Sequence, residues 1–327
     1  MDLPISCRAA LEELINSSSC STADLRDAAA RMTVSYKEDS GHGGRLVTNR
    51  TAVLAYAAAR MPATYGAVHT ALSHTLQTLD PHDTEHISTV LDLGAGTGAA
   101  TLAVTECLHD GISITAVERE PEMRAVGQHL TTGCNVRWVQ ADALEYVRTM
   151  AKDGKTFDVV ISSYMTNEMS EETRTTLFSL LWQITDGILL LVEPGTKVGS
   201  AILRNARRQF LAEGADICAP CPAVGDCPIG EDDWCHFTCR VARSKLHKAL
   251  KGGDVPYEDE KFSYLALTRL PHSNAANRIL RHPQKDPGRI TLTLCTETGC
   301  SIRTVTKRDK AAFTAARKAD AGDSIEL

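Results

Sequence analysis

The sequence has no run approaching the roughly 20 consecutive apolar residues of a membrane-spanning helix, so we expect no contact with a membrane. Its first residues, MDLPISCRAALEEL, lack the basic and apolar regions of a secretory signal. They also lack the arginine excess of a mitochondrial transit peptide, and no internal repeat is visible. What is present, 43% apolar and 23% charged residues, is typical of a soluble globular protein.

No strong charge of either sign dominates, but the charge is unevenly distributed. The net charge is −6, yet residues 201–327 carry 20 Lys and Arg against 16 Asp and Glu, an excess of +4. A basic patch is therefore expected only in this second part of the chain. With 327 residues, the chain can form one sizeable core and a smaller appended module.

Eleven cysteines are many for a chain without an export signal, and their odd number disfavours a disulfide framework. Five of them fall within 22 residues, between Cys218 and Cys239, and two more follow at Cys295 and Cys300. This clustering indicates binding of a metal ion or a metal cluster.

The first part of the chain, residues 1–85, predicts an N-terminal helical module. Alanine and leucine dominate, without strand-like alternation, in the segments 9–15, 23–32 and 52–61. Pro62 suits the first turn of a further helix over 64–79, and a flexible break is expected at 40–44.

From Ser88 onward, short apolar strands alternate with helices, which predicts an α/β fold with a parallel, doubly wound sheet over 86–213. The expected strands are 89–93, 112–117, 136–139, 157–161 and 188–192. The expected helices are 98–108, 121–131, 143–152 and 170–184. A cysteine-rich insert with a basic helix is expected over 214–260. Strands and a helix over 261–327 are expected to complete the sheet and the cysteine site.

A glycine-rich run, LDLGAGTG, stands where the first strand turns into a helix. Glycines at such a turn let the main chain approach a ligand closely. A carboxylate about 20 residues later can accept hydrogen bonds from the hydroxyls of a ribose. With the acid before the glycines, this pattern favours S-adenosylmethionine over a dinucleotide. A scaffold that keeps its glycines only for the turn is the alternative. The predicted cofactor-binding residues are Asp92, Gly94, Gly96, Gly98, Glu118 and Asp142.

Catalytic residues are less clearly indicated. Base-methylating enzymes of this fold often carry Asn/Asp-Pro-Pro-Tyr/Phe after the fourth strand, whereas this chain reads SSYMTNE. Tyr164 could stack on a base and Asn167 could bind one, and these are the catalytic candidates. A plain helix-entry loop capped by Asn167 or Ser170 is an equally good interpretation.

Within the insert, prolines follow Cys221 and Cys227 and restrict the main chain beside each sulfur. Four such thiolates could hold Zn²⁺ or an iron–sulfur cluster, and the spacings do not match paired C-x2-C zinc knuckles.

The motifs Cys-Pro-x4-Cys-Pro and Asp233-Trp-Cys-His-Phe resemble the ribosomal-small-subunit methyltransferase-like family. This family belongs to the class I S-adenosylmethionine-dependent methyltransferase superfamily and includes bacterial proteins and mitochondrial small-subunit assembly factors. The resemblance extends to Arg60-Met-Pro-Ala-Thr-Tyr65, the glycine run, Leu191–Thr196 and Leu294-Cys295-Thr, and so covers nearly the whole chain.

The resemblance implies a Rossmann-like class I methyltransferase fold and a four-iron–four-sulfur cluster. The ligands that it implies are Cys221, Cys227, Cys235 and Cys295, with Cys218 as the runner-up. Such a cluster is expected to be structural, because it would tie the insert to the C-terminal strands.

A basic run begins five residues after Cys235 and is predicted to contact ribosomal RNA from one helix face. Its members are Arg240, Arg243, Lys245, Lys248 and Lys251. An ordinary solvated helix face is the alternative.

Two functions fit these features: an S-adenosylmethionine-binding, iron–sulfur assembly factor of the small ribosomal subunit, or an active rRNA methyltransferase. The first is favoured because Asn-Pro-Pro-Tyr is missing. Small-subunit rRNA and proteins are the expected partners of a monomer in the bacterial cytoplasm, with the mitochondrial matrix as the alternative. A radical S-adenosylmethionine enzyme is disfavoured, because the C-x3-C-x2-C motif is missing.

Overall fold

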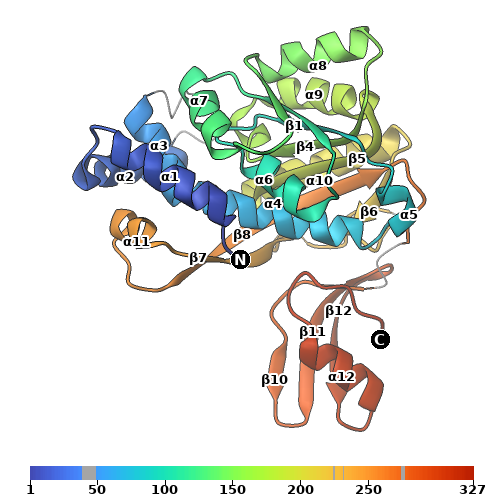
Figure 1. Ribbon diagram of the computed structural model, residues 1–327. Coiled ribbons are helices and arrows are strands. Elements are labelled where there is room, and N and C mark those ends of the chain that lie inside the picture. Colours follow the sequence, from blue (N-terminus) through green and yellow to red (C-terminus); the bar gives the residue numbers. More distant parts are fainter. Residues whose placement is uncertain (39–48, 224, 231, 274–276) are drawn as a thin grey trace.

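The computed structural model describes residues 1–327 except 39–48, 224, 231 and 274–276 (Figure 1). The break expected at 40–44 therefore lies outside the described residues. No helix in the described part of the chain is long and apolar enough to cross a bilayer.

The helices lie close to their expected positions, and Pro62 occupies the first turn of α4. The helices are α1 (Ile5–Ser17), α2 (Thr22–Glu38), α3 (Arg50–Ala59), α4 (Met61–Leu76), α5 (Pro81–Thr84), α6 (Ala99–Cys107), α7 (Pro121–Leu130), α8 (Ala143–Lys152), the 3-10 helix η1 (Thr166–Glu168), α9 (Glu171–Gln183), α10 (Lys197–Ala212), α11 (Lys245–Lys251) and α12 (Lys310–Lys318).

The strands form two sheets. Those of the first are β1 (Thr89–Leu93), β2 (Ser113–Val117), β3 (Val136–Val139), β4 (Phe157–Ser163), β5 (Thr185–Pro194), β6 (Asp216–Ala219), β7 (Phe237–Ala242) and β8 (Tyr257–Thr268). Those of the second are β9 (Asn277–Ile279), β10 (Gln284–Asp286), β11 (Arg289–Thr296) and β12 (Gly299–Thr306).

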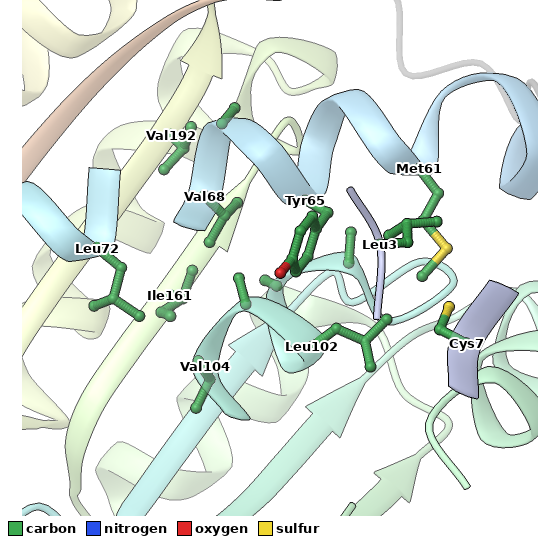
Figure 2. Packing of buried hydrophobic residues seen from close by; sticks show 14 of the residues in the cluster. Leu3, Cys7, Met61, Tyr65, Val68, Leu72, Leu102, Val104, Ile161 and Val192 are labelled. Atoms are coloured by element: carbon green, nitrogen blue, oxygen red, sulfur yellow. The ribbon is translucent and has the colours of Figure 1, made fainter. Parts of the chain in front are cut away.

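The first sheet has the order β3-β2-β1-β4-β5-β8-β6, and β1 to β5 are parallel. This confirms the predicted α/β fold, with a sheet that is parallel from β1 to β5 and therefore mostly parallel. Successive residues of its buried strands point to opposite faces. Val90 and Val192 join a core with α4 and α6, whereas Leu91 and Leu191 join a core with α9 and α10. Figure 2 shows the first core, where Leu72 of α4 lies near Ile161 of β4. The result is a helix–sheet–helix sandwich.

The N-terminal helices contribute to that first core. Leu11 of α1, Leu25 of α2 and Leu54 of α3 belong to the same buried cluster as the strands. Helices therefore occur where they are expected over 1–85, while an independent N-terminal module remains a prediction.

Strand β8 reverses direction and extends the sheet. Residues 262–268 pair antiparallel with β5, and on its other side β8 pairs with β6 and then β7. The expectation that C-terminal strands complete the sheet thus holds for β8 alone. β11 and β12 belong to the second sheet, which packs with α12 around Leu292 and Ala316 and lies below the first in Figure 1.

Candidate functional site

The glycine turn follows β1 and leads into α6. Gly94, Gly96 and Gly98 all have positive φ, at 73°, 55° and 88°, a region that side chains other than glycine rarely adopt. A Cβ on Gly94 would lie 2.5 Å from the sulfur of Met165, whereas one on Gly96 would meet nothing within 4 Å. The turn is thus closely packed on one side and open at Gly96.

Glu118 follows β2 and lies against this turn. Its Oε2 accepts a hydrogen bond from the Gly96 amide at 2.9 Å, and its Oε1 accepts one from the Glu120 amide at 2.8 Å. The side chain is nearly buried, and this burial raises its pKa. The structure therefore brings together the glycines and the acid that the sequence proposed as partners.

Asp92 lies behind the turn and not at its open side. Its side chain is fully buried, and Oδ2 accepts hydrogen bonds from the amide and the hydroxyl of Thr101, at 2.9 and 2.7 Å. Burial raises its pKa to about 6. These bonds fasten β1 to α6, so Asp92 supports the turn from within the fold.

Asp142 follows β3 and forms the N-cap of α8. Its Oδ1 accepts hydrogen bonds from the amides of Leu144 at 2.9 Å and Glu145 at 3.2 Å. The carboxylate is exposed at the edge of the sheet where β1 and β2 also end. Helix capping is thus its visible role.

Tyr164 and Asn167 lie just beyond β4. Tyr164 is the only non-glycine residue with a positive φ in the described part of the chain, at 56°, and its hydroxyl donates to Glu260 Oε1 at 2.9 Å. Asn167 lies in η1, and its buried Oδ1 has no hydrogen-bond partner among the described residues. Ser170 caps α9 by accepting from the Thr173 amide, as the helix-entry interpretation predicted.

Tyr164 and Asn167 line a cleft of about 930 Å³. Helices α2, α3, α10 and α11 and strand β8 also line it. The charged groups in its lining include Arg60, between α3 and α4, Lys251 of α11 and Glu258 of β8. The cleft is large enough to admit a small ligand.

Glu193 was not singled out as a site residue from the sequence. It is 1% exposed near the end of β5, and its Oε1 accepts from the amide of Thr166 at 3.0 Å and from its hydroxyl at 2.5 Å. Burial raises its pKa to about 7. Glu193 therefore fixes the start of η1, which carries Asn167. The sequence signal that could have identified Glu193 is an acidic residue near the end of an otherwise apolar strand.

The cysteines that the resemblance implied converge from three segments. One cavity of about 40 Å³ is lined by Cys221, Cys227, Cys235 and Cys295. Cys295 lies in β11 and also packs with Ile229 and Leu280. Four thiols are the kind of ligand that Zn²⁺ or an iron–sulfur cluster takes. In the described part of the chain, however, no group of three or more Cys, His, Asp or Glu side chains is arranged to hold a metal ion, so the cluster remains a proposal.

The other cysteines of this region lie elsewhere. Cys218 is buried in the sheet core and donates to the Ala266 carbonyl at 3.5 Å. Cys239 is buried on β7, and Cys300 is exposed on β12 opposite Cys295. None of these three lines the cavity.

The prediction that the basic run lies on one face of a single helix is wrong. Arg240 lies in β7, and α11 begins only at Lys245. Arg240 pairs with Asp259 at 2.7 Å, and Glu258 pairs with Arg243 and Lys251. These acids come from β8, which returns alongside β7 and neutralises the run. Lys245 and Lys248 have no acidic partner in the described part of the chain.

A second basic set is exposed on the C-terminal sheet and α12. None of its members forms an ion pair with Asp or Glu within the described ranges. They are Arg303, Lys307, Arg308, Lys310, Arg317 and Lys318.

The strand order and the glycine turn define a Rossmann-like α/β protein of the class I methyltransferase type. The chain belongs to the Rsm22 family: the family model described as mitochondrial small ribosomal subunit Rsm22 matches residues 50–326. The family resemblance seen in the motifs is thereby confirmed.

Curated relatives agree with this assignment. The chain is 26% identical over 293 residues to the human "Ribosome assembly protein METTL17, mitochondrial", covering 84% of this chain and 62% of that protein. It is 23% identical to "Rsm22-cox11 tandem protein 2, mitochondrial" of Schizosaccharomyces pombe, covering 84% and 43%. The chain therefore spans less than two thirds of the length of these relatives.

Solved structures show weaker likeness. A magnesium protoporphyrin IX methyltransferase from Synechocystis, with bound S-adenosylmethionine, is 12% identical, with a TM-score of 0.39 over 77% of this chain and 99% of that chain. Fibrillarin from Aeropyrum pernix is 10% identical, with a TM-score of 0.37 over 62% and 76%. Because these identities and TM-scores are low, we assign the fold from the strand order alone.

Proposed function

We propose that this chain is an S-adenosylmethionine-binding assembly factor that docks on the RNA of a small ribosomal subunit. The observation that carries the proposal is the family match over residues 50–326, together with the names of the relatives. The chain retains both the glycine turn and the cysteine set.

The methyl donor would be held at the carboxyl edge of the sheet. Gly96 has open space beside it, and Glu118 can exchange its bond to the Gly96 amide for the hydroxyls of a ribose. Asp92 would act indirectly, by holding the turn. Asp142 would contribute from the first turn of α8.

The thiol cavity would hold the four-iron–four-sulfur cluster through Cys221, Cys227, Cys235 and Cys295, with Zn²⁺ as the alternative metal. When bound, the group would supply a cross-link between the insert and the C-terminal sheet. Cys235 and Cys295 already contribute to one small hydrophobic cluster, so the cross-link would reinforce an existing contact. We therefore assign it a structural role.

RNA would bind the cations that have no acidic partner among the described residues. From the predicted basic run these are Lys245, which is exposed, and Lys248, which is half-buried, and the set on the C-terminal sheet enlarges this surface. Arg240, Arg243 and Lys251 are assigned to internal ion pairs.

Methyl transfer is the alternative function, and the cleft beside Asn167 is the observation that favours it. The Oδ1 of Asn167, which has no hydrogen-bond partner among the described residues, could accept a hydrogen bond from an exocyclic amine. Tyr164 is less available, since its hydroxyl is bound to Glu260.

Incubation of purified small-subunit precursor with a labelled methyl donor separates the two functions. The assembly role predicts binding of the precursor without transfer of label to rRNA. Methyl transfer would be established instead if label appears in the rRNA and Asn167→Ala abolishes this labelling while precursor binding persists.

We propose that the chain acts as a monomer and has no membrane partner. Its relatives are named as mitochondrial proteins, which supports the matrix as the compartment over the bacterial cytoplasm. Fractionation of the source cells, followed by sedimentation with and without ribosomal subunits, tests both points.

A further inference from the structure

Two buried guanidinium groups line the thiol cavity, and neither has a described acidic partner. Arg207 of α10 is 3% exposed and Arg278 of β9 is 2% exposed. Nε and Nη1 of Arg207 and Nη2 of Arg278 are buried without a hydrogen-bond partner among the described residues. Burial of an unpaired charge is strongly unfavourable, so a group that compensates it is expected here.

The bonds that these arginines do form hold them beside the cysteines. Arg207 Nη2 donates to the Ala223 carbonyl at 2.8 Å, and Arg278 Nε donates to the Pro220 carbonyl at 3.0 Å. These carbonyls flank Cys221 in the sequence. Arg278 Nη1 also donates to Gly322 at 2.7 Å, which joins the insert to the C-terminal segment. The acceptors are neutral, so they orient the two guanidinium groups without cancelling their charge.

We propose that Arg207 and Arg278 are the counter-charges of an anionic iron–sulfur cluster held by the cysteines. This inference rests on the proposed cluster. Thiolate ligands give such a cluster a net negative charge, and hydrogen bonds to its sulfurs help to set its reduction potential. The free N–H groups of the arginines supply both the charge and the donors. The arginines are positioning residues, which favour retention of the cluster and ease its reduction.

Arg207 allows a matched set of variants. Arg207→Met removes the charge while keeping an unbranched side chain, and Arg207→Lys keeps the charge. Arg208→Met removes a charge from the next residue of the same helix, which is exposed. Each full chain is reconstituted anaerobically with ferrous iron and sulfide. The readouts are bound iron and sulfide, the rate of cluster loss to a chelator, and the midpoint potential in a dithionite titration.

The proposal predicts that Arg207→Met shifts the one-electron reduction equilibrium about tenfold toward the oxidised form, which is about 59 mV more negative. We expect the variant to release its cluster to the chelator about tenfold faster, because the same favourable charge interaction is missing. Arg207→Lys should restore most of both values, and Arg208→Met should match the unsubstituted chain.

The metal-free chains separate this role from a merely structural one. A counter-charge without its anion is unfavourable, so metal-free Arg207→Met should unfold at the same temperature as the unsubstituted metal-free chain, or at a higher one. A variant that is less stable or unfolded without metal would overturn the proposal, as would an unchanged potential and rate of loss. If the unsubstituted chain takes up Zn²⁺ but no iron and sulfide, the cluster and this inference both fail.

Discussion

Glu118 and Gly96 are joined by a hydrogen bond of 2.9 Å between the carboxylate and the main-chain amide. On the other side of the turn, Asp92 accepts both hydrogen bonds of Thr101. Two carboxylates from neighbouring parallel strands thus fix the glycine turn at both ends. A ligand at this edge meets a main chain that is already ordered, which lowers the entropic cost of binding.

Replacing Glu118 by alanine tests this site. The change removes the acceptor proposed for the ribose hydroxyls, and hydrogen bonds to a charged group contribute about 1.5–3 kcal/mol. We expect affinity for S-adenosylmethionine to fall by about 10- to 100-fold, measured by isothermal titration calorimetry. Glu122→Ala, at a half-buried position in the first turn of α7, is the matched control and should leave the affinity unchanged. Equal affinities for all three chains would remove Glu118 from the site.

Burial of Glu193 predicts that the stability of the fold depends on pH. Burial raises its pKa from 4.5 to about 7, so the folded chain keeps a proton that the unfolded chain releases over this range. Its contribution to stability therefore falls as the pH rises from 4.5 to 7. Glu193→Gln keeps an oxygen acceptor for Thr166 and does not titrate. The stability of this variant relative to the unsubstituted chain should rise over that window by up to about 3 kcal/mol.

Denaturant unfolding at pH 5 and at pH 7.5 measures this difference. Glu171→Gln, an exposed acid in the first turn of α9, serves as the control and should show no such trend. A relative stability of Glu193→Gln that stays flat or falls with pH would mean that the buried carboxylate is ionised throughout.

The local parts of the fold were predictable, because they follow from short-range patterns. β1 lies at the predicted residues, and α8 begins at Ala143 after its Asp142 cap. The glycine turn and Glu118 meet because parallel neighbouring strands end at the same edge. Cys295 is 60 residues from Cys235, so its place in the cavity came from the family resemblance and not from spacing.

The errors arose where a distant or reversed segment decides the outcome. Arg240 seemed free because its partner, Asp259, belongs to a strand whose antiparallel return the charge pattern did not reveal. Glu193 and Arg207 carry ordinary residue types, and their burial depends on packing across the sheet. Strands were expected over 261–327, but they were assigned to the first sheet. Their separate sheet was not foreseen, because its other strands, β9 and β10, have three residues each, too few to show a periodicity.

Glu258 is the centre of the ion network that replaced the basic stripe. His247, Lys251 and Arg243 surround its carboxylate, with the nearest atoms of His247 and Arg243 both 3.1 Å away. Although burial opposes it, hydrogen bonds from His247 and Lys251 hold the pKa of Glu258 well below its usual value. A lowered pKa gives stability that is present above pH 4.5 and is lost as the pH falls through the folded pKa.

Glu258→Gln should therefore destabilise the chain at pH 7 by about 3 kcal/mol, as expected when one partner of a buried charge network is removed. The difference should shrink in acid. Denaturant unfolding at pH 7 and pH 3 measures it. Asp259→Asn, which breaks only the exposed pair with Arg240, should cost much less, because solvent screens that pair. If both variants cost the same at pH 7, the network does not hold α11 in place.

The cations of the C-terminal sheet give the last prediction. Lys307, Arg308 and Lys310 are exposed and have no acidic partner among the described residues, so they are free to contact phosphates. Each contact releases counterions, and the slope of log K against log salt falls by about 0.9 for each phosphate in a duplex, or about 0.7 in a single strand. Replacing all three by glutamine should weaken binding of small-subunit rRNA and make the slope shallower by about 2–3.

Filter binding at several salt concentrations measures both quantities. Arg240→Gln combined with Arg243→Gln is the control, since both guanidinium groups are held by Asp259 and Glu258 and should contribute little to the slope. A larger decrease in slope in this control than in the triple variant would instead place the RNA surface on the paired strands β7 and β8. The C-terminal sheet would then be left to act through other partners. An unchanged slope in both would mean that binding depends on Lys245 and Lys248 or on contacts without charge.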